Sequence, residues 1–170
     1  MKSIKLMTLA ILVFVCQTAF AQDFEIPKNI QLEKESDYAQ YEVDVLNGIN
    51  WLENTPLNEQ TTKRENANAF VLAWIIGTPS VTIELHTFQV DLTKKNSVLM
   101  TTFLGGWAKF ALENPSEKNN NIKGNIAGFQ SLMKVYAANK GKGIKKDNKV
   151  EKLLKRSPVE LEAWVRKEVE

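Results

Sequence analysis

The chain has 170 residues, of which 25% are charged, and it contains one cysteine and one histidine. These counts exclude a disulfide scaffold, a zinc–thiolate site and a multi-histidine metal site, because each needs several such ligands. No calcium-loop or phosphate-loop motif is present in the sequence. We therefore expect no metal and no cofactor.

Residues 1–21 have the layout of a cleavable secretory signal peptide. Lys2 and Lys5 give a positive start, an apolar run covers 6–15, and Ala19-Phe20-Ala21 is a small-residue cleavage site. The apolar run is about half the roughly 20 residues that a membrane-spanning helix needs. The pattern predicts export to the periplasm or the extracellular space, with no transmembrane span after cleavage.

Cleavage changes the composition of the remaining protein. It removes the only cysteine, Cys16, and two of the 22 basic residues, which leaves 20 basic residues against 20 acids. A balanced charge gives no support for nucleic-acid binding, so no nucleic-acid partner is expected. A cysteine-free chain of this size fits one domain that is stabilised by its packed core.

Helical periodicity dominates residues 36–170, which we interpret as a single helical domain behind an extended arm at 22–35. Ser36 is the expected cap of the first helix, which Asn54-Thr55-Pro56 ends. A second helix is expected over 58–76, before Gly77-Thr78-Pro79. Further helices are expected from 97 to 113, from 122 to 136 and, after Asp147 and Ser157, at the C-terminal end.

Glycines inside two of these helices indicate close packing. Gly105 and Gly106 lie within the helix at 97–113, and Gly124 and Gly128 lie one turn apart in the next helix. Each costs up to about 1 kcal/mol of helix propensity compared with alanine. That cost is usually accepted where a neighbouring backbone comes close, so we expect contact between helices here.

Residues 80–92 fit two interpretations. Alternating Val81, Ile83 and Leu85 favour a half-buried strand, whereas Val81, Leu85, Phe88 and Leu92 share one helical face. A lone strand would have no partner elsewhere in the chain, which favours the helix. The predicted fold class is therefore all-α, with six or seven helices in antiparallel hairpins and residues 80–92 either helical or extended.

Candidate catalytic residues are few and carry no diagnostic spacing. His86 is the only ordinary acid–base group for neutral pH, with Glu84 and Asp91 nearby in sequence. Glu84, Asp91 and Glu113 flank apolar segments and are the candidates for a pair of carboxylates acting on a polysaccharide. No G-x-S-x-G elbow accompanies them. Whether the protein is an enzyme therefore stays open, and a protein without catalytic activity is favoured.

Five lysines in ten residues form the one concentrated charge: Lys140, Lys142, Lys145, Lys146 and Lys149. Such a patch can bind an anionic polymer or an acidic partner, although most charge runs are simply solvated.

These observations favour a ligand-binding or protein-interaction module of the cell envelope, with an envelope protein or a small ligand as its partner. Two alternatives stay open: a small carboxylate-dependent hydrolase or lytic enzyme acting on an envelope polysaccharide, and a structural or inhibitory protein without a pocket.

Overall fold

The computed structural model describes residues 24–169, which contain helices and no β-strand. The predicted all-α class is therefore confirmed, whereas the expected signal peptide lies outside the described residues. The α-helices are α1 (Glu35–Tyr38), α2 (Glu42–Asn54), α3 (Thr61–Gly77), α4 (Thr87–Thr93), α5 (Val98–Glu113), α6 (Asn121–Asn139), α7 (Asn148–Leu153) and α8 (Pro158–Val169). Two 3-10 turns, η1 (Ala39–Tyr41) and η2 (Pro115–Glu117), separate some of them.

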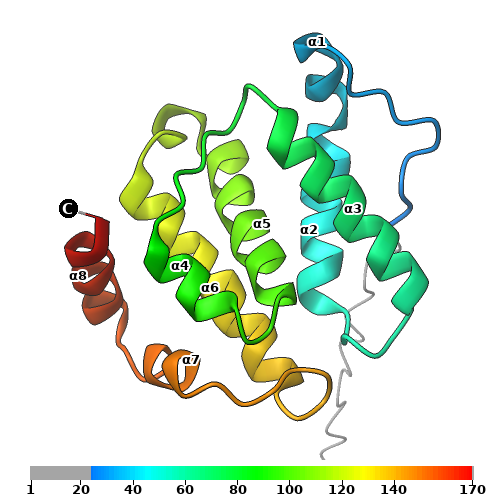
Figure 1. The fold of residues 1–170 in the computed structure, drawn as a ribbon. Helices are drawn as coiled ribbons and strands as arrows, with labels where there is room; N and C mark the ends of the chain where they lie inside the picture. Colours follow the sequence, from blue (N-terminus) through cyan, green and yellow to red (C-terminus); the bar gives the residue numbers. More distant parts are fainter. Residues whose placement is uncertain (1–23, 170) are drawn as a thin grey trace, which may run out of the picture.

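The helices pack as hairpins, as expected. Helix α5 reverses direction into α6, and α2 pairs with α3 beside them (Figure 1). The connections α2–α3, α4–α5 and α6–α7 lie together at one end of the molecule, at the bottom of Figure 1. Three segments that are far apart in sequence therefore meet at this end.

The prediction that Ser36 caps the first helix is wrong. Helix α1 begins at Glu35, and the Asp37 carboxylate accepts the N–H groups of Glu33 and Lys34 at 3.2 and 3.1 Å. A carboxylate at the third helical position satisfies N–H groups that have no intrahelical partner.

The first helix is also interrupted, which its periodicity did not indicate. The Glu42 N–H bonds to the Ala39 carbonyl, so the Tyr38 carbonyl does not receive the Glu42 N–H that an uninterrupted α-helix would supply. That carbonyl instead accepts the indole N–H of Trp74 at 2.9 Å. The 3-10 turn thereby provides a buried partner for the Trp74 indole, which would otherwise be costly to bury.

Residues 80–92 divide between the two interpretations. Residues 81–86 have no regular secondary structure, and α4 starts only at Thr87, so the favoured prediction of helix throughout is wrong for the first half. Ile83 packs against both hydrophobic clusters of the protein. An extended chain advances about twice as far per residue as a helix, which allows this segment to pass from α3 to α4.

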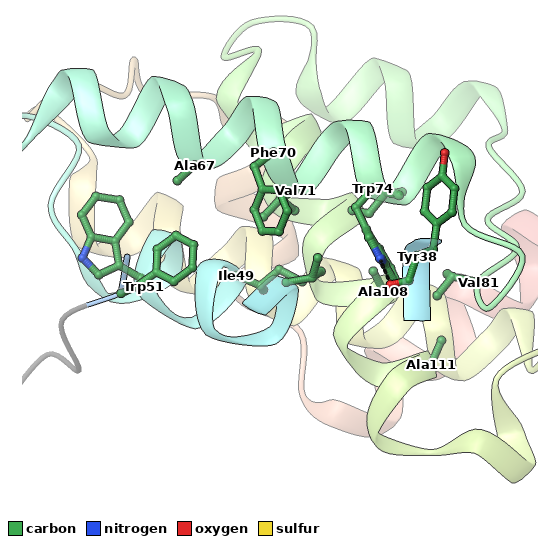
Figure 2. Close-up of a cluster of buried hydrophobic side chains, with 13 residues drawn as sticks. Tyr38, Ile49, Trp51, Ala67, Phe70, Val71, Trp74, Val81, Ala108 and Ala111 are labelled. Atoms are coloured by element: carbon green, nitrogen blue, oxygen red, sulfur yellow. Dashed lines mark hydrogen bonds between the residues drawn. The ribbon is translucent and has the colours of Figure 1, made fainter. Parts of the chain in front are cut away.

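Two hydrophobic clusters form the core. The first lies between α2, α3 and the C-terminal half of α5, and includes Trp51, Phe70 and Trp74 (Figure 2). The second is centred on Phe103, Trp107 and Phe129, and α7 and α8 close it. Phe24 anchors the segment before α1 in the first cluster, whereas Ile30 of the same segment is 36% exposed.

The glycine interpretation holds at three of four positions. A Cβ at Gly106 would lie 2.5 Å from the Ser131 Cβ, and one at Gly128 would lie 2.7 Å from the Phe103 ring. A Cβ at Gly124 would meet the Trp107 indole at 2.3 Å. Gly105 differs, because its Cβ would make ordinary contacts of 3.5 Å with Ile49. The glycines thus allow α5 and α6 to approach closely.

The C-terminal helices begin where the sequence predicts. Asp147 caps α7 by accepting the Lys149 N–H at 2.8 Å. At α8, the Ser157 N–H donates to Glu160 Oε2 at 2.7 Å, and the Glu160 N–H donates to Ser157 Oγ at 3.3 Å. This reciprocal pair is the expected capping box.

Candidate functional site

The structure pairs two of the four catalytic candidates. Glu84 Oε1 lies 3.8 Å from His86 Nε2, and Glu84 Oε2 accepts the Asn121 amide at 3.1 Å. The His86 ring also lies 5.9 Å from the Phe88 ring, centroid to centroid. Within residues 24–169 no serine hydroxyl is hydrogen-bonded to this ring. The pair thus lacks the nucleophile that a Ser/His/Asp arrangement requires.

Asp91 lies apart from that pair, between two lysines. Its oxygens are 2.7 Å from Lys94 Nζ and 3.2 Å from Lys149 Nζ. The hydrogen bond from Lys94, followed by that from Lys149, lowers the pKa of Asp91. A general acid for glycoside hydrolysis needs a raised pKa, so this carboxylate is suited to holding lysines rather than to proton donation.

Glu113 lines a different groove, of about 340 Å³, between α5 and α6. The other acid there is Glu53, whose carboxylate accepts the Ser131 hydroxyl and lies 3.3 Å from Lys134 Nζ. Glu53 therefore ties α2 to α6. The four acid–base candidates are thus distributed over three places, and the structure does not assemble them into one site.

The lysine patch is split by ion pairing. Lys140 Nζ lies 2.7 Å from Glu151 Oε1, and this bond is the main reason that the pKa of Lys140 is raised and that of Glu151 lowered. Lys149 holds Asp91, as described above. Lys142 and Lys145, in contrast, line an open groove.

Hydrogen bonds fix the lysine segment against the α4–α5 connection. The Asn96 side chain accepts the Lys145 N–H and donates to the Lys145 carbonyl, both at 2.9 Å. Lys95 Nζ donates to the Lys146 carbonyl at 2.6 Å. These bonds, with the Lys149–Asp91 pair, form a seam along which residues 145–149 lie beside residues 91–96.

At the Asn96–Lys145 end of this seam lies the groove that we call the basic groove. Its volume is about 490 Å³, and its walls come from the connections α2–α3, α4–α5 and α6–α7. Four of its ten lining residues are cationic and the other six are neutral: the cations are Arg64, Lys95, Lys142 and Lys145. A groove with several cations and no acid favours anions.

Glycines shape the outer wall of the basic groove. Gly141 and Gly143 have φ values of +78° and +111°, in a region that other residues rarely adopt. Gly143 also lies against Leu57, since a Cβ added at Gly143 would be 3.5 Å from the Leu57 Cβ. The wall carrying Lys142 therefore depends on the α2–α3 connection for its position.

Arg64 is the deepest cation of the basic groove, with only 7% of its surface exposed. Its guanidinium donates to the carbonyls of Leu52, Thr55 and Pro56 at the end of α2 and lies 5.4 Å from the Trp51 ring. Its Nε has no hydrogen-bond partner, and no carboxylate forms an ion pair with it among the described residues. Burial lowers the pKa of Arg64.

A buried cation without a carboxylate is costly. Removing such a charge from water costs several kcal/mol unless another charge compensates it, and backbone carbonyls supply only part of that compensation. An anion in the groove would supply the missing charge.

A second groove, which we call the α7–α8 groove, lies at the Asp91–Lys149 end of the seam. Its volume is about 230 Å³, and Lys149, Lys152 and Arg156 contribute its cations. Its two acids, Asp91 and Glu168, are engaged by neighbours, since Glu168 accepts the Trp164 indole N–H at 3.0 Å. Both grooves thus present cations along the same segment.

Charge is segregated over the chain as a whole. Residues 140–156 contain eight lysines or arginines and two acids, Asp147 and Glu151. The rest of the chain after residue 21 contains twelve basic residues and eighteen acids. A protein whose balance is near zero therefore has one strongly basic end.

Sequence reasoning missed four of the cations: Arg64, Lys95, Lys152 and Arg156. Arg64 and Lys95 are distant from the lysine patch in sequence, so only the fold brings them to it. Lys152 and Arg156 continue the patch, and a longer window for counting charge would have included them.

No helix within residues 24–169 is long and apolar enough to cross a bilayer. No group of three or more Cys, His, Asp or Glu side chains in that range could hold a metal ion.

Comparisons with known proteins give no match: no family model fits the sequence, and no curated protein or solved structure is significantly similar to it. The fold and the grooves define a small all-α protein with a basic end. Its function is therefore argued from the chemistry of that end.

Proposed function

We propose that this protein is a ligand-binding module that holds an anionic ligand in the basic groove. The single observation that carries the proposal is the composition of that groove, which has four cations, no acid, and a buried arginine without a carboxylate partner. Its volume of about 490 Å³ is in the range of small-molecule sites.

Binding fits the site better than catalysis. Turnover requires a nucleophile or an acid–base pair within reach of a bound ligand. The residues lining the basic groove include no His, Asp, Glu or Cys, so they offer charge and hydrogen-bond donors but no ordinary acid–base group. If the chain is exported as its first 21 residues predict, the ligand belongs to the cell envelope or its surroundings.

Calorimetric titration with tripolyphosphate tests the proposal. The test variant K142Q/K145Q removes two groove cations and keeps Arg64, which contributes to the end of α2. The control variant K28Q/K118Q removes the same charge elsewhere. Lys118 lies before the start of α6 and the groove lies beyond its end. The 19 residues of α6, which span about 28 Å, therefore separate Lys118 from the groove.

We expect tripolyphosphate to bind the unaltered protein and the control alike, and K142Q/K145Q at least about tenfold more weakly, since each lost charge contact is worth about 1 kcal/mol. Binding should also weaken with salt, because screening shortens the reach of exposed charges. Equal weakening in both variants would mean that net charge alone matters. No binding to the unaltered protein would refute the proposal.

A further inference from the structure

The structure offers two cationic grooves rather than one, and they lie at the two ends of one seam. The basic groove holds Lys95, Lys142 and Lys145, and the α7–α8 groove holds Lys149, Lys152 and Arg156. A ligand confined to the basic groove leaves the second set of cations unused. We infer that the ligand is a linear phosphate polymer that runs along the seam and occupies both grooves; this rests on the proposed function.

The seam that separates the grooves is itself cationic. Lys95 Nζ is bonded to the Lys146 carbonyl, and Lys94 and Lys149 hold Asp91 between them. Two acids belong to the seam. Lys94 and Lys149 offset the charge of Asp91, and Asp147 is buried, with its carboxylate accepting the Lys149 N–H. An anionic chain that passes from one groove to the other therefore meets no exposed acid on the seam without a lysine partner.

The seam also holds the two grooves in a fixed relation. The two Asn96–Lys145 hydrogen bonds, together with the Lys95–Lys146 and Lys149–Asp91 contacts, attach residues 145–149 to the α4–α5 connection. Preorganised cations bind a long ligand at lower entropic cost than flexible ones. Two linked contacts of one chain can then exceed the affinity of either contact by about 10²–10⁴-fold.

Phosphate fits these grooves better than carboxylate does. Four cations surround the basic groove, and most are lysines, which bind phosphate as point charges. Each phosphate within a chain carries one negative charge shared by two free oxygens, as a carboxylate does. Neighbouring phosphates are joined by a single bridging oxygen, however, whereas the carboxylates of a peptide are separated by backbone and side-chain atoms. A phosphate chain therefore presents more negative charge per unit length and can engage several cations together.

A chain-length series tests the inference: orthophosphate, tripolyphosphate and long-chain polyphosphate, with affinities expressed per phosphate. Three double variants are compared with the unaltered protein: K142Q/K145Q in the basic groove, K152Q/R156Q in the α7–α8 groove, and K28Q/K118Q as the charge-matched control. The single variant K152Q serves as well, because Arg156 lies 5.1 Å from the Trp164 ring and its loss could disturb packing.

We expect long-chain polyphosphate to bind at least about 100-fold more tightly than tripolyphosphate. K152Q/R156Q, and to a smaller extent K152Q, should remove most of that gain and leave tripolyphosphate binding unchanged. K142Q/K145Q should weaken binding of both probes.

Four results would overturn the inference. If chain length brings no gain, or if K152Q/R156Q does not reduce it, the ligand occupies the basic groove alone, and the proposed function stands. If polyglutamate binds as tightly as polyphosphate of similar charge, the ligand is an acidic peptide segment. If single-stranded DNA of equal charge binds more tightly still, the bases contribute and the ligand is a nucleic acid. If no phosphate probe binds at all, the inference and the proposed function fail together.

Discussion

At the scale of single residues, glycine positions decide how closely α5 and α6 pack. Gly128 leaves no room for a Cβ, which would lie 2.7 Å from the Phe103 ring and 2.8 Å from the Phe103 carbonyl oxygen. Gly105 lies in the same hairpin but has room, with its nearest contacts at 3.5 Å. Comparing the two positions therefore distinguishes the steric effect of adding a Cβ from the low helix propensity of glycine.

We predict that Gly128→Ala destabilises the protein by about 1–3 kcal/mol, as overpacking of a core does. Gly105→Ala should be neutral or stabilising by up to about 1 kcal/mol, because alanine has the better helix propensity. Urea unfolding measures both free energies. Equal effects at the two positions would contradict this account of the hairpin.

Arg64 combines a structural role with a ligand role. Its guanidinium donates to carbonyls at the end of α2, so its substitution should affect stability as well as binding. We predict that R64M lowers the free energy of unfolding by about 1–3 kcal/mol through the lost charged hydrogen bonds. It should also remove most of the stabilisation that saturating tripolyphosphate gives the unaltered protein in thermal unfolding. Stabilisation of R64M by the ligand to the same extent would exclude Arg64 from the site.

At the scale of elements, the start of α8 depends on one capping box. Ser157 Oγ accepts the Glu160 N–H, whereas Ser97 at the start of α5 makes no side-chain capping bond. We predict that S157A lowers the free energy of unfolding by about 1 kcal/mol and that S97A leaves it nearly unchanged. Chemical denaturation of both variants checks this. A similar loss in S97A would show that the cap is not the cause.

The attachment of α7 to α6 should depend on pH. Hydrogen bonds from Lys140, and then from Tyr136, lower the pKa of Glu151 below its ordinary value of 4.5. A carboxylate with a lowered folded-state pKa stabilises the fold fully above the unfolded-state pKa, and this stabilisation is lost as pH falls through the folded-state value. We predict that E151Q is less stable than the unaltered protein near neutral pH. The difference should shrink as the pH falls below 4.5, which urea unfolding at several pH values measures. A constant difference would indicate a packing effect.

At the scale of the whole molecule, the basic and acidic residues are unevenly distributed, although their numbers are nearly equal. Residues 140–156 carry eight basic residues and two acids, whereas acids exceed bases over the rest of the chain after residue 21. Such a molecule presents a local field of each sign.

We predict that the protein, although nearly neutral overall, is retained by a cation exchanger at low salt and neutral pH. K142Q/K145Q should elute earlier from that column than K28Q/K118Q, although both variants lose the same charge. Identical elution of the two would mean that the basic end does not act as a distinct surface.

Much of the fold follows from the sequence because its determinants are local. Helical periodicity, the Ser157 capping box and the Asp147 cap predict α-helices at the observed places, and the helix glycines predict the close α5–α6 contact. The Ser36 error is local, because Asp37 serves as the capping carboxylate in its place. The other errors occur where a distant residue decides the local structure. The Trp74 indole donates to the Tyr38 carbonyl at the point where the first helix is interrupted. Ile83 packs between two hydrophobic clusters, which no local sequence pattern reveals.

The candidate site was only half visible in the sequence. A run of lysines is a local feature, so Lys142 and Lys145 could be singled out from composition alone. Only the tertiary structure showed that Lys140 and Lys149 are held by Glu151 and Asp91. The sequence by itself determined most of the helices, the caps at Asp147 and Ser157 and the lysine run, because neighbours along the chain set them. The tertiary structure decided which cations share a groove, because Arg64 and Lys95 reach it only when three separate connections meet at one end of the molecule.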